Sequence, residues 1–135
     1  MRKLALDLGD ARIGVAISDL LNITANPRET YKRKDPETDI QYFADYAKRE
    51  GCDTIVLGLP INMDGTFGRM VEKVKTFGDE LQRVSGIKVV YQDERLTTVS
   101  AEKTLISANV RRDKRKQVID KVAATIILQS YLEKI

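Results

Sequence analysis

The sequence predicts an α/β fold in which a mixed five-stranded sheet is flanked by helices. Three observations lead to this prediction. Two β-rich runs near the N-terminus flank a glycine turn, two later apolar runs enclose an amphipathic helix, and the chain ends in a long apolar helix. A chain of 135 residues with 42% hydrophobic composition can bury one substantial core, so we expect a single domain over residues 1–135.

A hairpin is predicted at the N-terminus. Leu4–Leu8 and Arg12–Ser18 are apolar, β-rich runs, and residues 9–11 (Gly-Asp-Ala) between them have the composition of a turn. A weaker extended segment covers about residues 23–31. We therefore expect two antiparallel strands and a third strand after them.

The first helix is predicted to follow Asp35. This residue can serve as the N-cap, and Pro36 suits the first helical turn. Apolar residues then recur at the i, i+3, i+4, i+7 spacing of one helix face, at Ile40, Phe43, Ala44 and Ala47. Gly51 ends this helix.

A strand, a helix and a second strand are predicted in the middle of the chain. Thr54–Leu59 is a continuous apolar run of the kind found in parallel sheets, and Ile87–Gln92 is the second strand. The helix between them, at about residues 67–84, has one apolar stripe and is stopped by Ser85 and Gly86. A right-handed crossover makes the two strands parallel, so their C-terminal ends meet at the edge where open sheets bind ligands.

The remainder of the chain is predicted to be mostly helical. Thr97 or Thr98 can cap a short helix that reaches about Ala108. A basic loop then leads to a last helix at about residues 114–132, which is apolar nearly all round and should pack on the sheet.

The composition excludes several classes of protein. The net charge of +3 is too small to identify a partner, and no run approaches the roughly 18 apolar residues of a membrane span. The N-terminus lacks a secretory signal, so we expect a soluble, cytoplasmic protein. Without histidine, and with Cys52 as the single cysteine, Cys/His zinc sites and Ser-His-Asp triads are excluded. A catalytic metal would therefore need oxygen ligands.

Asp7 is the most unusual acidic residue, because aspartate is poorly suited to strands and this one interrupts an apolar run. Strand alternation places it near the strand end, on the opposite face from Leu4, Leu6 and Leu8. A half-buried carboxylate there needs a partner charge or a metal. The alternative is that Asp7 accepts backbone hydrogen bonds from the turn at Gly9.

Further acidic residues are candidates for the same site. Asp93 and Glu94 follow a predicted strand and face opposite ways, so only one can point toward Asp7, unless they merely form a salt bridge at the strand end. Asp120 lies within the last helix and either faces the sheet or is exposed beside a lysine. Three such carboxylates would bind Mg²⁺ or Mn²⁺, and two ions can activate water and stabilise the leaving oxygen of a phosphodiester.

Basic residues provide candidate contacts to nucleic-acid phosphates. A dense run comprises Arg111, Arg112, Lys114, Arg115 and Lys116, and a looser group comprises Arg28, Lys32, Arg33 and Lys34. A solvated surface is the alternative for either run. Arg12 lies across the hairpin from Asp7, Arg69 follows a loop at residues 62–66 that could also contact phosphate, and Arg95 follows the acidic pair.

Four ordered motifs resemble the YqgF family, also called RuvX. They read LDLGDARIGVAIS, TIVLGLPINMDGT, VVYQDERLTT and IDKVAATIILQSYL, and the resemblance spans essentially all 135 residues. It implies a ribonuclease H-like domain of bacterial origin that acts as a metal-dependent nuclease. Matched motif by motif, it implies that Asp7, Glu94 and Asp120 are catalytic and bind Mg²⁺ or Mn²⁺.

The resemblance leaves the substrate open. One implied role is maturation of the 5′ end of pre-16S rRNA in ribosome biogenesis, with ribosomal precursor particles as partners; the other is resolution of Holliday junctions in DNA recombination and repair. A module that binds nucleic acid without cutting it is a further alternative. An actin-type ATPase is disfavoured, because such enzymes clamp nucleotide between two domains and this chain supplies one. Both a monomer and a homodimer are compatible with the sequence.

Overall fold

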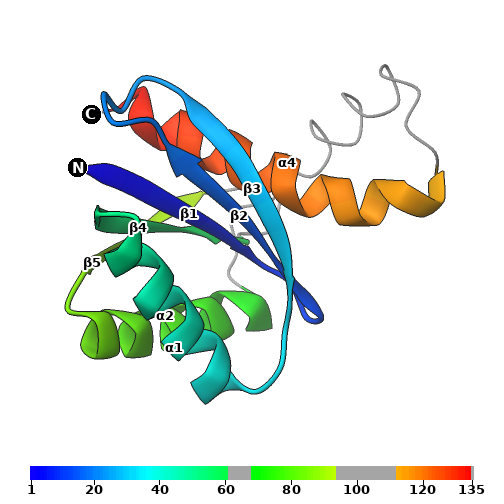
Figure 1. Cartoon of the computed structure of the whole chain (residues 1–135). Coiled ribbons are helices and arrows are strands. Elements are labelled where there is room, and N and C mark those ends of the chain that lie inside the picture. The colour runs from blue at the N-terminus through cyan, green and yellow to red at the C-terminus, as the bar shows by residue number, and fades with distance from the viewer. Residues whose placement is uncertain (61–67, 94–111, 135) are drawn as a thin grey trace.

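A five-stranded sheet with the strand order β3-β2-β1-β4-β5 forms the centre of the structure (Figure 1). The computed structural model describes residues 1–60, 68–93 and 112–134, with the side chains of residues 112–121 excepted. The strands are β1 (Arg2–Leu8), β2 (Arg12–Ser18), β3 (Ala25–Lys32), β4 (Cys52–Leu59) and β5 (Lys88–Asp93), and the helices are α1 (Pro36–Arg49), α2 (Arg69–Ser85) and α4 (Arg112–Leu132). The predicted α/β fold with a mixed five-stranded sheet is therefore confirmed.

The sheet combines an antiparallel and a parallel half. β1 pairs antiparallel with β2, and β2 pairs antiparallel with β3. On the other side β1 pairs in parallel with β4, and β4 pairs in parallel with β5. The carboxyl ends of β1, β4 and β5 consequently lie at one edge of the sheet, where the crossover predicted them.

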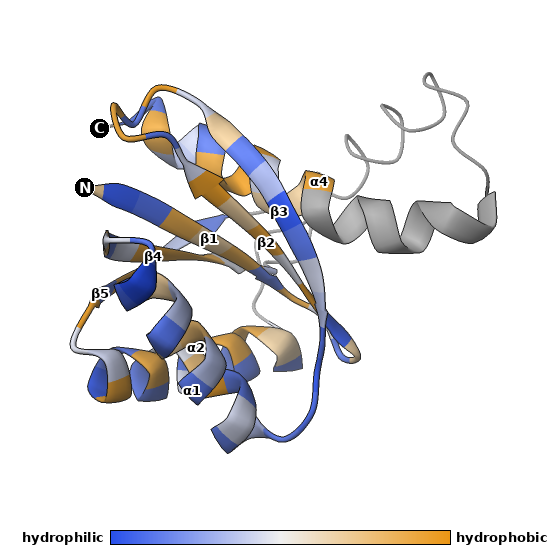
Figure 2. Ribbon diagram, viewed as in Figure 1, coloured by the Kyte–Doolittle hydropathy of each residue, from blue (hydrophilic) through white to orange (hydrophobic). Residues whose placement is uncertain are grey.

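Helices cover both faces of the sheet: α1 and α2 lie on one face and α4 lies on the other (Figure 1). Both α1 and α2 carry hydrophobic and hydrophilic residues on different sides, as amphipathic helices do (Figure 2). The predicted apolar stripes are buried, with Phe43 of α1 and Val74 of α2 fully inaccessible to solvent. Within the described residues, none of the helices is long and apolar enough to span a membrane.

The two faces of the sheet are packed with side chains of different size. Leu4 and Leu6 of β1 belong to a large core cluster under α1 and α2 that includes aromatic residues. Ala5, on the opposite face, belongs to a smaller cluster with Ala16 of β2 and Ala124 of α4. Where β1 and β2 face α4, the sheet therefore carries small residues, over which the helix can approach the strands closely.

The element boundaries differ from the predicted ones by at most two residues. β1 begins at Arg2 because pairing with Cys52 of β4 extends it, and α4 begins two residues before the predicted start. Boundaries are set by pairing and caps rather than by the apolar pattern, so shifts of this size are expected. The short helix predicted to start at Thr97 or Thr98 lies outside the described residues.

A buried carboxylate, that of Asp39 in α1, connects this helix to β3 and the segment after it. It accepts hydrogen bonds from the Tyr31 hydroxyl at 2.9 Å, the Lys34 backbone N–H at 3.0 Å and Arg33 Nε at 3.3 Å. Burial, together with the hydrogen bond to Asp39, raises the pKa of Tyr31 to about 12. In the sequence, Asp39 is indistinguishable from an ordinary exposed acidic residue in the first turn of a helix.

Substitution of this carboxylate should be strongly destabilising. Asp39→Ala would leave the Arg33 guanidinium without its buried partner and Tyr31 without an acceptor, so we expect the free energy of unfolding to fall by about 3 kcal/mol. Urea unfolding measures this. Asp53→Ala is the control, because Asp53 forms a 2.6 Å ion pair with Lys3 but its side chain is 39% exposed, and it should cost less than about 1 kcal/mol. Equal losses in the two variants would contradict the structural role of Asp39.

Candidate active site

Asp7 lies near the carboxyl end of β1, at the edge of the sheet where the parallel strands end. Its neighbours Leu6 and Leu8 belong to the core under α1 and α2. Strand alternation places Asp7 on the other face, with Ala5, which packs against α4. The residue is half-buried, as its position in the sequence predicted.

Two glycines flank Asp7 on the α4 face of the sheet. Gly14 of β2 is its antiparallel partner. On the other side, Leu6 pairs with Leu57 of β4, so the next residue, Gly58, lies beside Asp7. Both glycines are buried and neither has a side chain that could fill the space next to the carboxylate. A carboxylate whose neighbours on the adjacent strands carry no side chains suits a divalent cation, which needs several further oxygen ligands around it.

Two cations lie close to Asp7 on the same face. Arg12 is two residues from Gly14 on β2, so it is the diagonal neighbour of Asp7, a Cα separation of roughly 7–8 Å in an antiparallel pair. Lys32 of β3 is the register partner of Arg12 and is exposed. A polyanion that approached the Asp7 carboxylate would therefore meet two basic side chains at the same edge of the sheet.

The turn after Asp7 is closed by Gly9. Its backbone N–H donates to the Arg12 carbonyl oxygen at 2.8 Å. A Cβ atom on residue 9 would lie 2.8 Å from the same carbonyl oxygen, which is too close for any side chain. Glycine in the Asp-Leu-Gly motif is therefore required by the tight turn between β1 and β2.

Alternation along β5 separates Asp93 from Asp7. Val90 packs in the cluster under α4, and the Gln92 side chain accepts a hydrogen bond of 2.9 Å from Lys134 Nζ at the end of α4. Asp93 therefore falls on the face covered by α1 and α2, opposite to Asp7. Of the two adjacent carboxylates, Glu94 remains the candidate for the Asp7 side, and it lies outside the described residues.

Other predicted site residues lie partly outside the described structure. Asp120 belongs to α4, as do Arg112, Lys114, Arg115 and Lys116, but none of these side chains is described. Glu94, Arg95, Arg111 and the loop at residues 62–66 are not described at all. Arg69 is exposed at the start of α2, on the face opposite to Asp7. The described side chains contain no group of three potential metal ligands, so the predicted acidic cluster is represented there by Asp7 alone.

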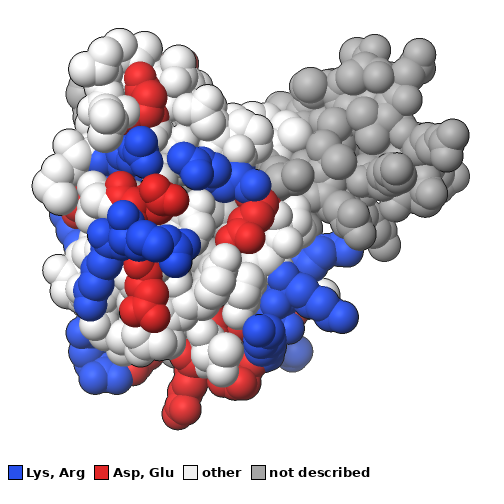
Figure 3. All heavy atoms as spheres, viewed as in Figure 1, with Lys and Arg blue, Asp and Glu red and all other residues white. Residues whose placement is uncertain are grey.

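The looser basic group divides into residues with different roles. Arg28 lies 3.8 Å from Glu50, which also pairs with Arg2, and Arg33 pairs with the buried Asp39. In Figure 3, basic and acidic side chains are mixed on the left of the view. Lys and Arg gather at the lower right, toward the end with the β1–β2 turn. Lys32 is the member that lies beside the candidate site, and only the pairing of β3 with β2 reveals this.

The strand order, the antiparallel hairpin and the helices on both faces define a ribonuclease H-like fold. Among solved structures, RuvC of T. thermophilus in complex with a Holliday junction substrate matches 99% of this chain and 94% of its own, with a TM-score of 0.64 and 10% identity. The fowlpox virus Holliday junction resolvase matches all of both chains, with a TM-score of 0.59 and 17% identity. At these identities the likeness establishes the fold.

The chain belongs to the RuvX family, whose model, described as Holliday junction resolvase, matches residues 1–134. Two curated relatives are described as candidate pre-16S rRNA nucleases. The one from Halalkalibacterium halodurans is 49% identical over 136 residues, covering 99% of this chain and 97% of the relative. The one from Halothermothrix orenii is 51% identical over 132 residues, covering 98% and 94%. The family suggested by the four sequence motifs is thus confirmed.

Proposed function

We propose that this protein is a metal-dependent nuclease that hydrolyses nucleic-acid phosphodiester bonds at the Asp7 edge of the sheet. The observation that carries the proposal is the placement of Asp7 on the α4 face, with Gly14 and Gly58 at its sides and two basic residues, Arg12 and Lys32, at the same edge. The carboxylate can bind a cation, the glycines place no side chain beside it, and the basic side chains can bind the flanking phosphates.

Helical spacing supports Asp120 as a second ligand. Ala124, Ile127 and Leu128 of α4 are buried against the sheet, and position 120 lies one turn before Ala124 on the same stripe. An acidic residue on this stripe would face the small residues of the sheet that surround Asp7.

The positions along the two elements also agree. Gln129 of α4 accepts a hydrogen bond from the backbone N–H of Ala25. Ser18, the last residue of β2, is the register partner of Ala25 and accepts a hydrogen bond from the backbone N–H of Lys3, at the start of β1. In Figure 1, α4 runs in the opposite direction to β1. Asp120 precedes Gln129 by about 13.5 Å of helix, and Asp7 follows Lys3 by about 13 Å of strand. We infer that Asp120 and Asp7 lie at the same level.

The proposed catalytic residues are Asp7, Glu94 and Asp120. When bound, Mg²⁺ or Mn²⁺ would activate the attacking water and stabilise charge on the leaving oxygen. The three carboxylates would hold the ions, and the absence of histidine from the chain fits an all-oxygen ligand set. Arg12, Arg69 and Lys32, together with Arg95 and the run Arg111, Arg112, Lys114, Arg115 and Lys116, would hold the nucleic acid in register.

The substrate we propose is the precursor of 16S rRNA, with 5′-end maturation in ribosomal precursor particles as the role. Support comes from the relatives at about half identity over nearly the whole chain, which are described by this substrate. The description of the family as a Holliday junction resolvase makes a four-way DNA junction the second candidate.

A single assay with both substrates tests the proposal. The purified protein is incubated with precursor rRNA carrying its 5′ extension and with a four-way DNA junction, each with Mg²⁺, with Mn²⁺ and with a chelator. We expect cleavage of the precursor RNA that requires the metal. Cleavage of the junction alone would replace the ribosomal role with the recombination role, and binding of both without cleavage under any condition would favour a binding module.

A further inference from the structure

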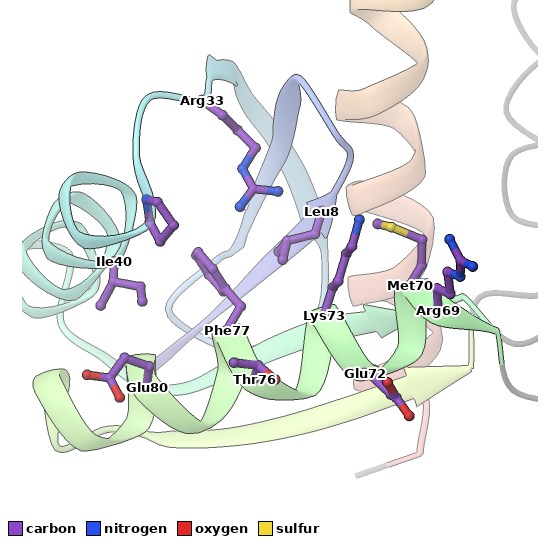
Figure 4. Close-up of a pocket in the computed structure, with 11 residues that line it drawn as sticks. Leu8, Arg33, Ile40, Arg69, Met70, Glu72, Lys73, Thr76, Phe77 and Glu80 are labelled. Atoms are coloured by element: carbon purple, nitrogen blue, oxygen red, sulfur yellow. The ribbon is translucent and has the colours of Figure 1, made fainter.

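A pocket lies on the other face of the sheet, between α1 and α2 at the carboxyl end of β1 (Figure 4). Its volume is about 680 Å³, which is within the usual range of small-molecule sites. The residues that line it include Leu8, Arg33, Ile40, Arg69, Lys73 and Phe77.

The pocket combines an apolar wall with basic residues at one end. Leu8, Ile40 and Phe77 form the apolar part. In Figure 4 the charged groups of Arg33 and Lys73 extend toward the end near Leu8, whereas Glu72 points away from the pocket. The second acidic residue, Glu80, is paired with Arg83 on the same helix. The basic end is therefore suited to an anion, and the apolar part is suited to a flat, weakly polar group.

Arg33 is held in place by the protein itself. Its Nη1 donates to the Gly9 carbonyl oxygen at 2.8 Å, its Nε donates to Asp39 at 3.3 Å, and its guanidinium carbon lies 5.7 Å from the centre of the Phe77 ring. These contacts join the β1–β2 turn, α1 and α2 at the top of the pocket. A cation fixed in this way loses little conformational entropy when it binds a phosphate.

The pocket and the candidate active site share the end of strand β1. Leu8 lines the pocket and directly follows Asp7, so the two sites lie on opposite faces of the same strand end. A sheet and a layer packed against its face are about 10 Å apart. A polynucleotide that passes over this edge of the sheet can therefore present a phosphate to Asp7 and place a base one or two nucleotides away in the pocket.

We propose that this pocket binds the base and phosphate of one unpaired nucleotide next to the scissile phosphate. The inference rests on the proposed nuclease function and narrows its substrate class to nucleic acid with a single-stranded segment at the cleavage site. The base lies against the apolar wall and its phosphate contacts Arg33, Lys73 and Arg69. A base within a continuous duplex is stacked and paired, so it cannot enter the pocket without being extruded.

Abasic scanning tests this proposal. A fluorescent single-stranded oligonucleotide that contains the cleavage sequence carries one abasic residue, which is moved stepwise along the strand, and binding is measured by anisotropy at fixed salt. Loss of a stacked base should weaken binding about tenfold at one position, a fixed number of nucleotides from the cleaved bond. Thr76→Glu, which introduces bulk and negative charge at the pocket wall, should weaken binding of the intact strand and remove the sensitivity to that abasic residue.

A matched pair of variants tests the phosphate contact. Lys73→Gln removes a cation that lines the pocket, and Lys75→Gln removes an exposed cation from the same helix outside it. We expect Lys73→Gln to weaken binding severalfold more than Lys75→Gln does. Uniform affinity across the abasic series, or equal affinity in the two lysine variants, would contradict the proposal that the pocket binds a nucleotide. Failure of the nuclease proposal has a different signature, because no metal-dependent cleavage of any substrate would then be seen, whatever the binding data show.

Discussion

Asp7→Asn is expected to lower metal-dependent cleavage by about a thousandfold or more, the upper range for removing one group that stabilises charge in a transition state. Asparagine keeps the size of the side chain but removes the negative charge that would hold the cation. Single-turnover cleavage of the preferred substrate measures the effect. Asp10→Asn is the control, because Asp10 is exposed in the turn three residues later and undergoes the same chemical change.

The same variant should remain folded and lose its response to metal. Without metal, removal of one charge from the proposed acidic cluster relieves repulsion, so the melting temperature should stay equal or rise. At a concentration of Mn²⁺ about 100 times the dissociation constant, the wild type should gain about 2.7 kcal/mol of stability, and Asp7→Asn and Asp120→Asn should gain much less. A variant that melts far below the wild type without metal would instead assign Asp7 a structural role. Equal stabilisation of all three proteins by metal would remove the metal-dependent mechanism.

Neutralisation of the basic run at the start of α4 is expected to produce the second large effect. Changing Arg111, Arg112, Lys114, Arg115 and Lys116 to glutamine removes five cations. If each contacts a phosphate, the slope of log affinity against log salt should fall by about 3 to 4 for a single strand and about 4 to 5 for a duplex, because fewer counterions are released. Affinity at low salt should then fall by orders of magnitude. Binding isotherms at four or more salt concentrations give the slope.

Two paired arginines provide the comparison for this prediction. Arg28→Gln and Arg83→Gln each remove a cation that lies beside a glutamate in the structure, so these variants should change the slope by much less per charge removed. If the five-residue variant has the wild-type slope, the run is a solvated surface and phosphate binding comes from the other basic residues, such as Arg12 and Lys32.

Much of the fold could be predicted because its elements have strong local signals. The apolar stripe of α1 follows the helical period after an Asp-Pro start, and Thr54–Leu59 is uninterruptedly apolar, as a buried parallel strand requires. The start of β1 was less predictable, because Arg2 and Lys3 are strand residues only through pairing with β4. Pairing is a long-range property, and the apolar pattern does not contain it.

The candidate site was predictable to a smaller extent. Asp7 could be found because an acidic residue in an apolar strand violates the local pattern. The glycines beside it, the position of Lys32 and the opposite orientation of Asp93 could not, since all three depend on which residues of neighbouring strands share a register. The buried carboxylate of Asp39 has no sequence signal at all, because its three donors lie outside α1.

The small residues of the sheet under α4 affect how this helix is positioned. Alanines such as Ala5 and Ala16 present few ridges for a helix to interlock with, so this part of the sheet offers little resistance to sliding of the helix. Polar contacts near the C-terminus also orient the helix: Gln129 Oε1 accepts from the Ala25 backbone at 3.1 Å, Gln129 Nε2 donates to the Ile23 carbonyl at 3.4 Å, and Lys134 donates to Gln92. The opposite end of α4, which carries the basic run, extends beyond the sheet (Figure 1). The described polar contacts therefore hold α4 at its C-terminal end, opposite to the end that carries the basic run.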